Sequence, residues 1–278
     1  MRLNCAGARL TERRLQIDKA PDALVAWMNS KFHYGREASR RYRYHPRSDR
    51  HSVALCRFVL SDVLRDCADL ATHGRSGRVT AGLNHKVTAP GGRGSKHVDL
   101  AVGLPVGEQQ GSFDKELGIR FGVIGRLLIG CEAKAVMTEH VKSKPRVFDE
   151  LSSSHEIVHR MWPGAIACGI VVVNSSKEFV SPTRQKSRRK LTVTQHRQPQ
   201  ATASMIEHLR KLPVRQSERE VGFDALGVIV LDFRNDASAV RLVEDEPAPQ
   251  RGDPLHYESL LERIVTLYRS GFSDLIGR

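Results

Sequence analysis

The sequence predicts an α/β fold, and three observations lead to this prediction. Apolar runs of strand length occur at 127–136, 165–174 and 223–233, with amphipathic stretches typical of helices between and around them. The order strand, helix, strand across 127–174 is a crossover unit, whose two strands lie parallel. Hydrophobic residues make up 40% of the 278 residues, so the chain can bury a sizeable core.

The N-terminal region, residues 1–75, is expected to be helical. Residues 22–41 and 52–71 show apolar spacing on one helix face, and in the second stretch Asp62, Asp66 and Asp69 are expected on the solvated face. Residues 73–95 are rich in Gly, Arg, Lys and Ser, a composition that indicates a basic loop. This loop leads into the strand-like stretch KHVDLAVG at 96–103.

The second half alternates strands and helices. After the strand at 127–136, we expect a helix whose first turn contains Pro145 and which ends at Trp162-Pro163. Residues 175–197 are polar, and 184–197, with six Lys or Arg and no acid, is either a second candidate DNA surface or a disordered basic loop. We expect a helix at 201–212, a strand at 223–233 and a closing helix at 256–269. We therefore expect a helical region over 1–75 that packs on a core formed by 76–278, together one compact domain.

A formal net charge of +13 favours a polyanionic partner, and nucleic acid is the commonest one. Basic residues gather in three stretches that would contact double-stranded DNA; the alternative is that they form solvated loop surfaces. The expected DNA-binding residues are Arg36, Arg40, Arg41, Arg43, Arg93, Lys96, Arg184, Lys186, Arg188 and Arg189.

The cysteines and the N-terminus favour a cytoplasmic protein. Five cysteines without a C-x-x-C pair predict neither a disulfide framework nor a zinc–cysteine site. The first ten residues, MRLNCAGARL, lack the apolar core of a signal peptide. The apolar runs are too short to span a bilayer, so no membrane partner is expected.

The most informative feature is a pair of charged residues in the apolar strand at 127–136. Side chains alternate along a strand, so Glu132 and Lys134 share one face, and Cys131 and Ala133 the other. Burying an acid and an amine is costly unless they pair or bind a ligand. A second carboxylate on a neighbouring strand, Asp99, would bring two acids and one amine to one point, a set that can hold a divalent metal against a phosphate.

Asp99, in His-Val-Asp-Leu, and the triplet Glu132-x-Lys134 resemble the PD-(D/E)xK nuclease superfamily over about 96–174. Val98 replaces the proline of that motif, and the 33 positions from Asp99 to Glu132 require an insertion between the two strands. Asp114, in the loop-like stretch GSFDKELG, is the rival first carboxylate. The alternative is a simple ion pair between Glu132 and Lys134, with Asp99 as a surface acid.

The resemblance implies a restriction-endonuclease-like core, in which a mixed central sheet is flanked by helices. It also implies an Mg²⁺-dependent endodeoxyribonuclease, with Mn²⁺ as a substitute, in which Asp99, Glu132 and the Ala133 carbonyl hold the metal and Lys134 positions the attacking water. Such an enzyme would resemble type II restriction enzymes, as a homodimer if it cuts both strands of a palindrome. Restriction, repair and mobile-element roles share this core. A further acid from a preceding helix, Glu37 or Asp62, could join the site.

A competing motif is the H-E-x-x-H sequence from His155 to His159, which on a helix can bind zinc. Three serines precede it, Arg160 follows it and Pro163 ends its helix, which is unlike the apolar surroundings of such sites. Glu178 is the nearest downstream third ligand. Two alternatives to the nuclease therefore stay open: a non-catalytic DNA-binding protein, and a zinc hydrolase that uses this motif.

Overall fold

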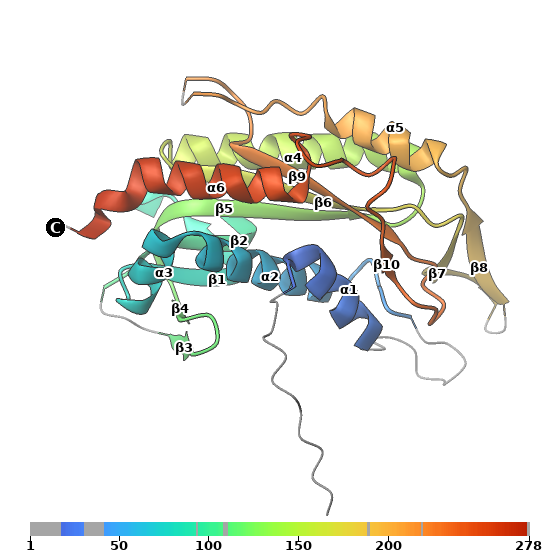
Figure 1. Ribbon diagram of the computed structural model, residues 1–278, viewed down its shortest axis with the longest axis horizontal. Helices are drawn as coiled ribbons and strands as arrows, with labels where there is room; N and C mark the ends of the chain where they lie inside the picture. The colour runs from blue at the N-terminus through green and yellow to red at the C-terminus, as the bar shows by residue number, and fades with distance from the viewer. Residues whose placement is uncertain are drawn as a thin grey trace, which may run out of the picture.

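A mixed eight-stranded sheet organises the computed structural model of the chain (Figure 1). Residues 18–30, 42–92, 94–107, 111–187, 190–217 and 219–276 are described, with backbone only for 90, 184–187, 190, 191 and 276. The sheet order is β10-β9-β6-β5-β2-β1-β4-β3, and β7 and β8 form a separate antiparallel ribbon. The strands are β1 (Thr80–Thr88), β2 (Ser95–Pro105), β3 (Ser112–Asp114), β4 (Ile119–Phe121), β5 (Ile124–Val136), β6 (Ile166–Asn174), β7 (Glu178–Ser187), β8 (Lys190–Gln195), β9 (Ala225–Asp232) and β10 (Arg241–Leu242).

Helices cover both faces of the sheet and enclose two hydrophobic cores (Figure 1). Helices α1, α2, α3 and α6 pack on one face, and α4 and α5 on the other. None of the helices in the described residues is long and apolar enough to cross a membrane. The helices are α1 (Ala20–Ser30), α2 (Arg50–Asp66), α3 (Ala68–Arg75), η1 (Pro90–Gly92), α4 (His140–Met161), α5 (Gln200–Leu209), α6 (Tyr257–Phe272) and η2 (Ser273–Ile276).

The predicted crossover unit is confirmed. β5 pairs with β6 in parallel register, α4 connects them, and β6 pairs with β9 in parallel as well. Every residue of β6 is buried, because helices cover both faces of this inner strand. β2 runs antiparallel to both β1 and β5, so the sheet is mixed, as predicted.

The insertion expected between the strands of Asp99 and Glu132 is also present. The chain leaves β2, forms the short strands β3 and β4 at the far edge of the sheet, and returns as β5. The loop predicted for GSFDKELG is therefore wrong in part, because Ser112–Asp114 pairs with Ile119–Phe121. These strands have three residues each, too few for a periodicity signal.

The basic loop predicted at 73–95 is wrong in part, because Thr80–Thr88 is the strand β1, which pairs with β2. Gly82 and Asn84 are turn-forming residues, and Asn84 has a left-handed φ of 46°. The strand therefore owes its conformation to pairing with β2 and to the burial of Ala81 and Val87. Local composition could not indicate this.

Several predicted boundaries shift. The helix expected at 52–71 is interrupted at Cys67, whose extended backbone separates α2 from α3. α4 begins at His140, so Pro145 lies inside the helix, where it lacks the N–H for a bond to the preceding turn. The basic loop that is one alternative for 184–197 is wrong in part, because β7 (Glu178–Ser187) and β8 (Lys190–Gln195) form an antiparallel ribbon. Of the helix expected at 22–41, α1 ends at Ser30, and 31–41 lie outside the described residues.

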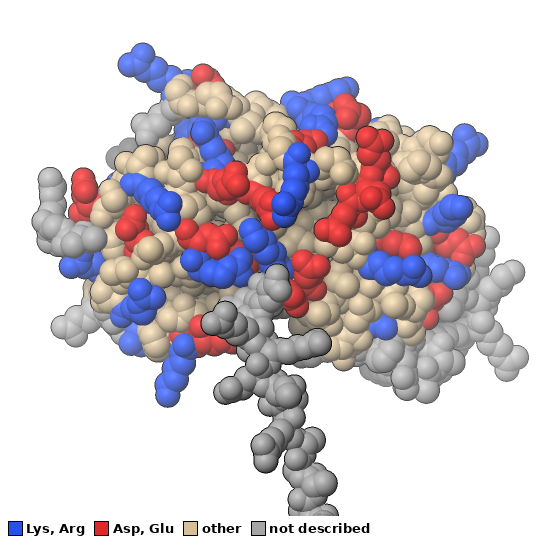
Figure 2. Space-filling model, viewed as in Figure 1, with Lys and Arg blue, Asp and Glu red and all other residues tan. Residues whose placement is uncertain are grey.

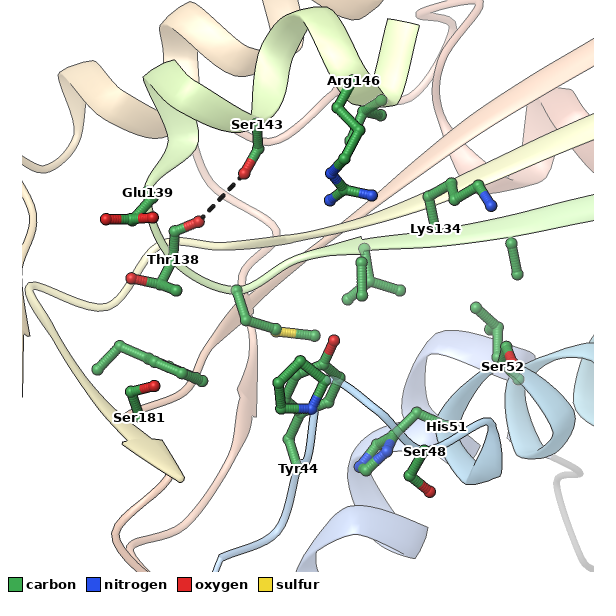
Figure 3. A pocket seen from close by; sticks show the side chains of 18 of the residues that line it. Tyr44, Ser48, His51, Ser52, Lys134, Thr138, Glu139, Ser143, Arg146 and Ser181 are labelled. Atoms are coloured by element: carbon green, nitrogen blue, oxygen red, sulfur yellow. Dashed lines mark hydrogen bonds between the residues drawn. The ribbon is translucent and has the colours of Figure 1, made fainter. Parts of the chain in front are cut away.

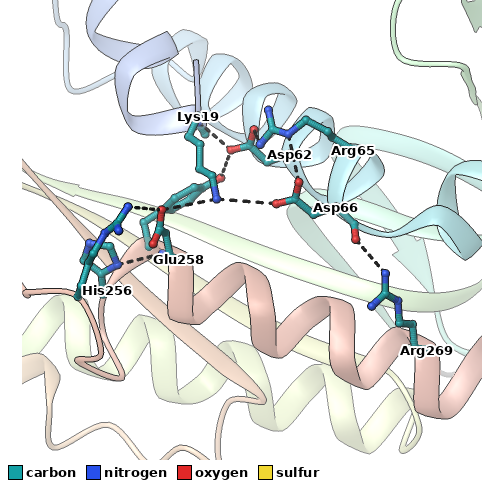
Figure 4. A network of polar contacts seen from close by, with 10 residues as sticks. Lys19, Asp62, Arg65, Asp66, His256, Glu258 and Arg269 are labelled. Carbon is teal, nitrogen blue, oxygen red and sulfur yellow. Dashed lines mark hydrogen bonds and ion pairs between the residues drawn. The ribbon is translucent and has the colours of Figure 1, made fainter. Parts of the chain in front are cut away.

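Asp62, expected on a solvated helix face, is instead 1% exposed and joins three helices (Figure 4). Its Oδ2 accepts hydrogen bonds from the Ala20 amide and the Tyr257 hydroxyl, each at 2.7 Å. Its Oδ1 lies 2.8 Å from Nη2 of Arg65. Asp62 therefore connects α1 and α6 to α2. This structural role accounts for its burial, and a role in an active site is not needed to explain it.

Replacement of Asp62 by alanine is expected to lower the free energy of unfolding by about 2–3 kcal/mol, because it leaves buried donors and Arg65 without their acceptor. Urea denaturation measures this loss. The matched control is Asp69→Ala in the first turn of α3, whose half-buried side chain makes no hydrogen bond within the described residues. A loss no larger for Asp62→Ala than for the control would contradict the structural role.

Candidate active site

The candidate residues lie where the backbone pairing of β2 with β5 ends. The register of these two strands stops at Leu100–Cys131, whereas β5 continues to pair with β6 as far as Val136. Glu132, Ala133 and Lys134 follow directly after this point. These three residues therefore pair with β6 on one side, but their backbone has no strand partner on the β2 side. Charged side chains can occupy the space beside the unpaired backbone.

Glu132 is buried, with 8% of its surface exposed, and three polar groups surround its carboxylate. Nζ of Lys134 lies 2.6 Å from Oε1, and Nζ of Lys96 on β2 lies 3.5 Å from Oε2. The Ser154 hydroxyl on α4 donates a hydrogen bond of 3.1 Å to Oε2. The predicted common orientation of Glu132 and Lys134 is confirmed, because both side chains reach residues of α4.

Lys134 connects this carboxylate to a second one on α4. Its Nζ lies 3.4 Å from Oε2 of Glu150, and Oε1 of Glu150 lies 2.9 Å from Nη1 of Arg146. Burial lowers the pKa of Lys134, but the Glu132 carboxylate and then Glu150 raise it, and the net pKa is above the usual lysine value. Lys134 is therefore a cation at neutral pH, and it is shared between two acids.

Asp99 is held against the backbone of the same triplet. Its Oδ2 accepts a hydrogen bond of 2.8 Å from the Ala133 amide, so a side chain replaces a strand carbonyl at this position. Burial raises the pKa of Asp99, the bond from Ala133 lowers it, the Glu132 charge raises it again, and the net pKa is above its usual range. A buried carboxylate beside a second carboxylate is a place where added positive charge is stabilising.

A cavity of about 590 Å³ opens beside Lys134, between α4 and the start of α2 (Figure 3). Arg146 extends from α4 into this cavity, and hydroxyl groups line its walls. Such a cavity has the size of many ligand sites, about 300–1,000 Å³. Its lining hydroxyl residues are Ser48, Ser52, Thr138, Ser143, Ser181 and Thr183.

The donor types at the site suit a hard cation. Asp99 and Glu132 supply carboxylate oxygens and Ala133 a carbonyl, and Mg²⁺ is usually bound by one or two carboxylates together with water and phosphate oxygens. Within the described residues no group of three or more His, Cys, Asp or Glu side chains is arranged to hold a metal. A cation here would compete with Lys96 and Lys134 for Glu132.

The rival carboxylate, Asp114, lies on β3 at the edge of the sheet. Its Oδ2 lies 2.6 Å from Nη1 of Arg57, and this contact lowers the pKa of Asp114. The strands β1 and β4 lie between β3 and β2 in the sheet. Asp114 is thus paired elsewhere, and Asp99 is the carboxylate that meets the Glu132 strand.

The predicted DNA contacts have separate outcomes. Arg43 is buried, and its guanidinium donates to the carbonyl oxygens of Met28, Ser238 and Ala237, so the expectation that it contacts DNA is corrected to a structural role. Lys96 lies at Glu132. The backbones of Arg184 and Lys186 belong to β7, and their side chains lie outside the description. The other six candidates and the helix acid Glu37 lie outside the described residues; the six are Arg36, Arg40, Arg41, Arg93, Arg188 and Arg189.

Lysine and arginine do not gather into one patch on the face that carries α1, α2 and α6 (Figure 2). Blue and red side chains alternate over this face. Acidic and basic groups in such a mixture cancel beyond a Debye length, about 8 Å at physiological ionic strength. A polyanion would therefore gain little from this side of the molecule.

The H-E-x-x-H motif lies in the second half of α4 and is used in packing. His155 is 1% exposed, and its ring lies edge-on to Phe223 at a centroid distance of 4.9 Å. Nε2 of His159 lies 2.9 Å from Oδ2 of Asp224. Glu178 pairs with Arg234 on another element. No third zinc ligand accompanies the two histidines in the described part of the chain.

Sequence reasoning missed the contribution of α4. Arg146, Glu150 and Ser154 lie four residues apart, so they form one row on the helix facing Glu132 and Lys134. This spacing is visible in the sequence, but three polar residues on a helix more often form its solvated face. Only the crossover geometry places the row above β5.

Comparison of the chain with protein-family models, with curated proteins and with solved structures finds no match. The functional assignment therefore rests on the residues and the geometry described above.

Replacement of Asp99 by asparagine is expected to increase the free energy of unfolding at neutral pH. Because the folded-state pKa of Asp99 is raised, the folded protein binds this proton more tightly than the unfolded chain, and stability is lost as the pH rises through that pKa. Asparagine keeps an acceptor for Ala133 without the charge. The gain should shrink as the pH falls towards the ordinary aspartate pKa of about 3.9.

Denaturation curves at several pH values measure this effect. The control is Asp114→Asn, for which the opposite sign is expected, because Arg57 lowers the pKa of Asp114 and its charge is stabilising at neutral pH. If both variants lost the same free energy of unfolding at neutral pH, the prediction that ionised Asp99 destabilises the fold would be contradicted.

Proposed function

We propose that this protein is an Mg²⁺-dependent DNA endonuclease of the restriction-endonuclease-like type. The observation that carries the proposal is the meeting of Asp99 with Glu132-Ala133-Lys134 at the point where β2 and β5 stop pairing. Two carboxylates on adjacent strands and a lysine beside them match the residue types and the strand order of the resemblance. The net charge of +13 supports a polyanionic substrate.

The metal would be held by Asp99, Glu132 and the Ala133 carbonyl. Bound Mg²⁺ supplies positive charge that stabilises the developing phosphorane-like charge and lowers the pKa of a coordinated water. The raised pKa of Asp99, which burial causes first and the Glu132 charge increases, supports this set of ligands, because a nearby cation would stabilise the buried carboxylate. Mn²⁺ presents similar preferences for oxygen ligands and is expected to substitute.

The role of Lys134 is to position the attacking water and to stabilise negative charge on the phosphate. A water oxygen forms a bond to phosphorus, and the bond from phosphorus to the 3′ oxygen breaks. The 3′ oxygen takes a proton and leaves as a hydroxyl, and the phosphate stays on the 5′ end. Glu150 holds Lys134 from the α4 side, so the amine keeps a fixed direction while Glu132 is engaged.

Double-stranded DNA is the proposed substrate, and the cavity beside Lys134 supports a contact with its backbone. Arg146 projects into this cavity, and guanidinium groups form paired hydrogen bonds with phosphate oxygens. A type II restriction enzyme is the proposed class, acting in the cytoplasm and as a homodimer where the target is a palindrome.

One observation favours a non-catalytic DNA-binding protein instead. Each site residue already has a structural partner: Lys134, Lys96 and Ser154 neutralise or bond Glu132, and Asp99 accepts from Ala133. A protein that only binds DNA needs nothing further. It would bind in a metal-independent and strongly salt-dependent way, and it would leave the DNA intact.

Replacement of Lys134 by alanine is expected to lower Mg²⁺-dependent cleavage of plasmid DNA at least about 100-fold, the usual cost of losing one charge-stabilising group in a transition state. Binding of DNA should change little, because one cation among many is lost. Gel analysis of plasmid cleavage and fluorescence anisotropy of a labelled duplex measure the two quantities.

The control is Lys211→Ala, which removes one exposed lysine from the end of the segment after α5. This variant should cleave like the wild type. Cleavage by Lys134→Ala at the wild-type rate would exclude the assigned site. Tight, salt-sensitive binding without any cleavage by the wild type would favour the binding protein.

A further inference from the structure

A second cavity, of about 420 Å³, lies at the opposite end of the sheet from Lys134. It is bounded by the start of β5, the turn before β6, the segment that precedes β9 and the last turns of α6. Arg126 and Glu132 are six residues apart on β5, so at about 3.3 Å per residue this cavity lies about 20 Å from the candidate active site. The two sites share no lining residue.

Three arginines and one carboxylate line this cavity. Arg126 comes from β5, Arg215 from the segment before β9 and Arg263 from α6, while Asp224 is the acid. Arg215 is 5% exposed, so its charge is largely removed from water. The wall therefore carries a surplus of two positive charges within one hollow, and like charges in a poorly hydrated space repel each other.

Asp224 is engaged by Arg215 and by two further donors rather than by Arg126 or Arg263. Oδ1 accepts from Nε of Arg215 at 2.7 Å, and Oδ2 from Nη2 of the same residue at 3.1 Å. Oδ2 also accepts from the Ala167 amide at 2.8 Å and lies 2.9 Å from Nε2 of His159. One buried aspartate is thus paired with one buried arginine, and the other two arginines remain.

The remaining two guanidinium groups have no acidic partner. Arg263 donates only to main-chain oxygens, those of Asp224 and Arg215, each at 3.3 Å. The exposed side chain of Arg126 makes no hydrogen bond or ion pair within the described residues. The hydroxyl groups of Ser217 and Ser270, which also line the cavity, already donate to Glu220 and to the Leu267 carbonyl oxygen. Among the charged side chains of the cavity, Arg126 and Arg263 are therefore the ones left to bind an anion.

We propose that this cavity is a binding site for a phosphate group, held by Arg126 and Arg263 and backed by the buried Arg215–Asp224 pair. Guanidinium forks match the geometry of phosphate oxygens in paired hydrogen bonds, which explains arginine rather than lysine at positions 126 and 263. Gly164 adds open space, because a side chain at this position would meet no atom within 4 Å. Leu267 and Phe272 form an apolar wall beside the arginines.

The phosphate can belong to a small phosphorylated ligand or to the DNA backbone, and the two sources share this chemistry. The apolar wall and the volume fit a nucleotide-sized anion. A position about 20 Å from the candidate active site would equally suit a second contact along bound DNA. The site does not depend on the proposed function, because it uses none of the candidate catalytic residues.

The test is titration calorimetry of the whole protein with inorganic pyrophosphate, with ADP, and with a short DNA duplex, at constant ionic strength. Arg126→Gln removes the one arginine without a partner, so it should fold normally. Arg241→Gln, on the exposed side of β10, is the control for loss of one positive charge. Arg215 is left unchanged, because its loss would bury Asp224 without a partner. Arg263→Lys is a second variant that keeps the charge and removes the fork.

Wild-type protein and Arg241→Gln are expected to bind pyrophosphate or ADP with a defined stoichiometry, and Arg126→Gln at least tenfold more weakly. Arg263→Lys should also bind more weakly although its charge is kept. If the duplex, and not the small ligands, loses tenfold in affinity on Arg126→Gln, the phosphate belongs to DNA. Affinities that are the same in Arg126→Gln and the control for all three ligands, or no binding of any of them, would overturn the proposal.

Discussion

The ion pair between Glu132 and Lys134 makes this part of the fold possible. An inner strand with a carboxylate at 8% exposure is stable only if positive charge lies beside it, and Nζ of Lys134 is 2.6 Å away on the same strand. Lys96 from β2 and Ser154 from α4 complete the surroundings of the carboxylate. The charged cluster therefore links three elements, and it sits where the crossover unit joins the antiparallel half of the sheet.

The end of pairing between β2 and β5 gives this cluster its chemical interest. Beyond Leu100–Cys131 the Ala133 amide bonds a side chain, Asp99, and not a strand carbonyl. A second acid is thereby brought near Glu132, and burial together with the Glu132 charge raises the pKa of Asp99. The pKa of Asp99 is raised, whereas the pKa of Asp114 is lowered by its contact with Arg57. Such unrelieved charge is typical of functional sites, at some expense of stability.

The parts of the fold that the sequence could predict are those in which one signal dominates. β6 and β9 are continuous apolar runs because both of their faces are buried, and their parallel order follows from α4 between β5 and β6. β1 was not predictable, because its Gly82 and Asn84 indicate a turn and only the pairing with β2 makes it a strand. The burial of Asp62 was not predictable either, because it depends on the docking of α1 and α6 over α2, which is a tertiary contact.

The candidate site was predictable only for the residues that a single sequence signal marks. Glu132 and Lys134 stand out because charges interrupt an apolar run, and alternation along a strand fixes their common face. Glu150 and Ser154 were not predictable, since their role depends on which face of α4 meets β5. Arg43 lay in a basic stretch, and only its enclosure by carbonyl oxygens reveals a structural role. Charge in a sequence indicates a partner, but not which residues remain free for it.

The most direct test of the central claim is metal binding by the carboxylate pair, measured by electron paramagnetic resonance of Mn²⁺ added to the protein. The account predicts a site that Mg²⁺ displaces, and at least a tenfold loss of affinity in Asp99→Asn and in Glu132→Gln. Asp114→Asn should bind Mn²⁺ like the wild type. Equal affinities in all four proteins would contradict the account and leave Glu132 and Lys134 as a structural ion pair.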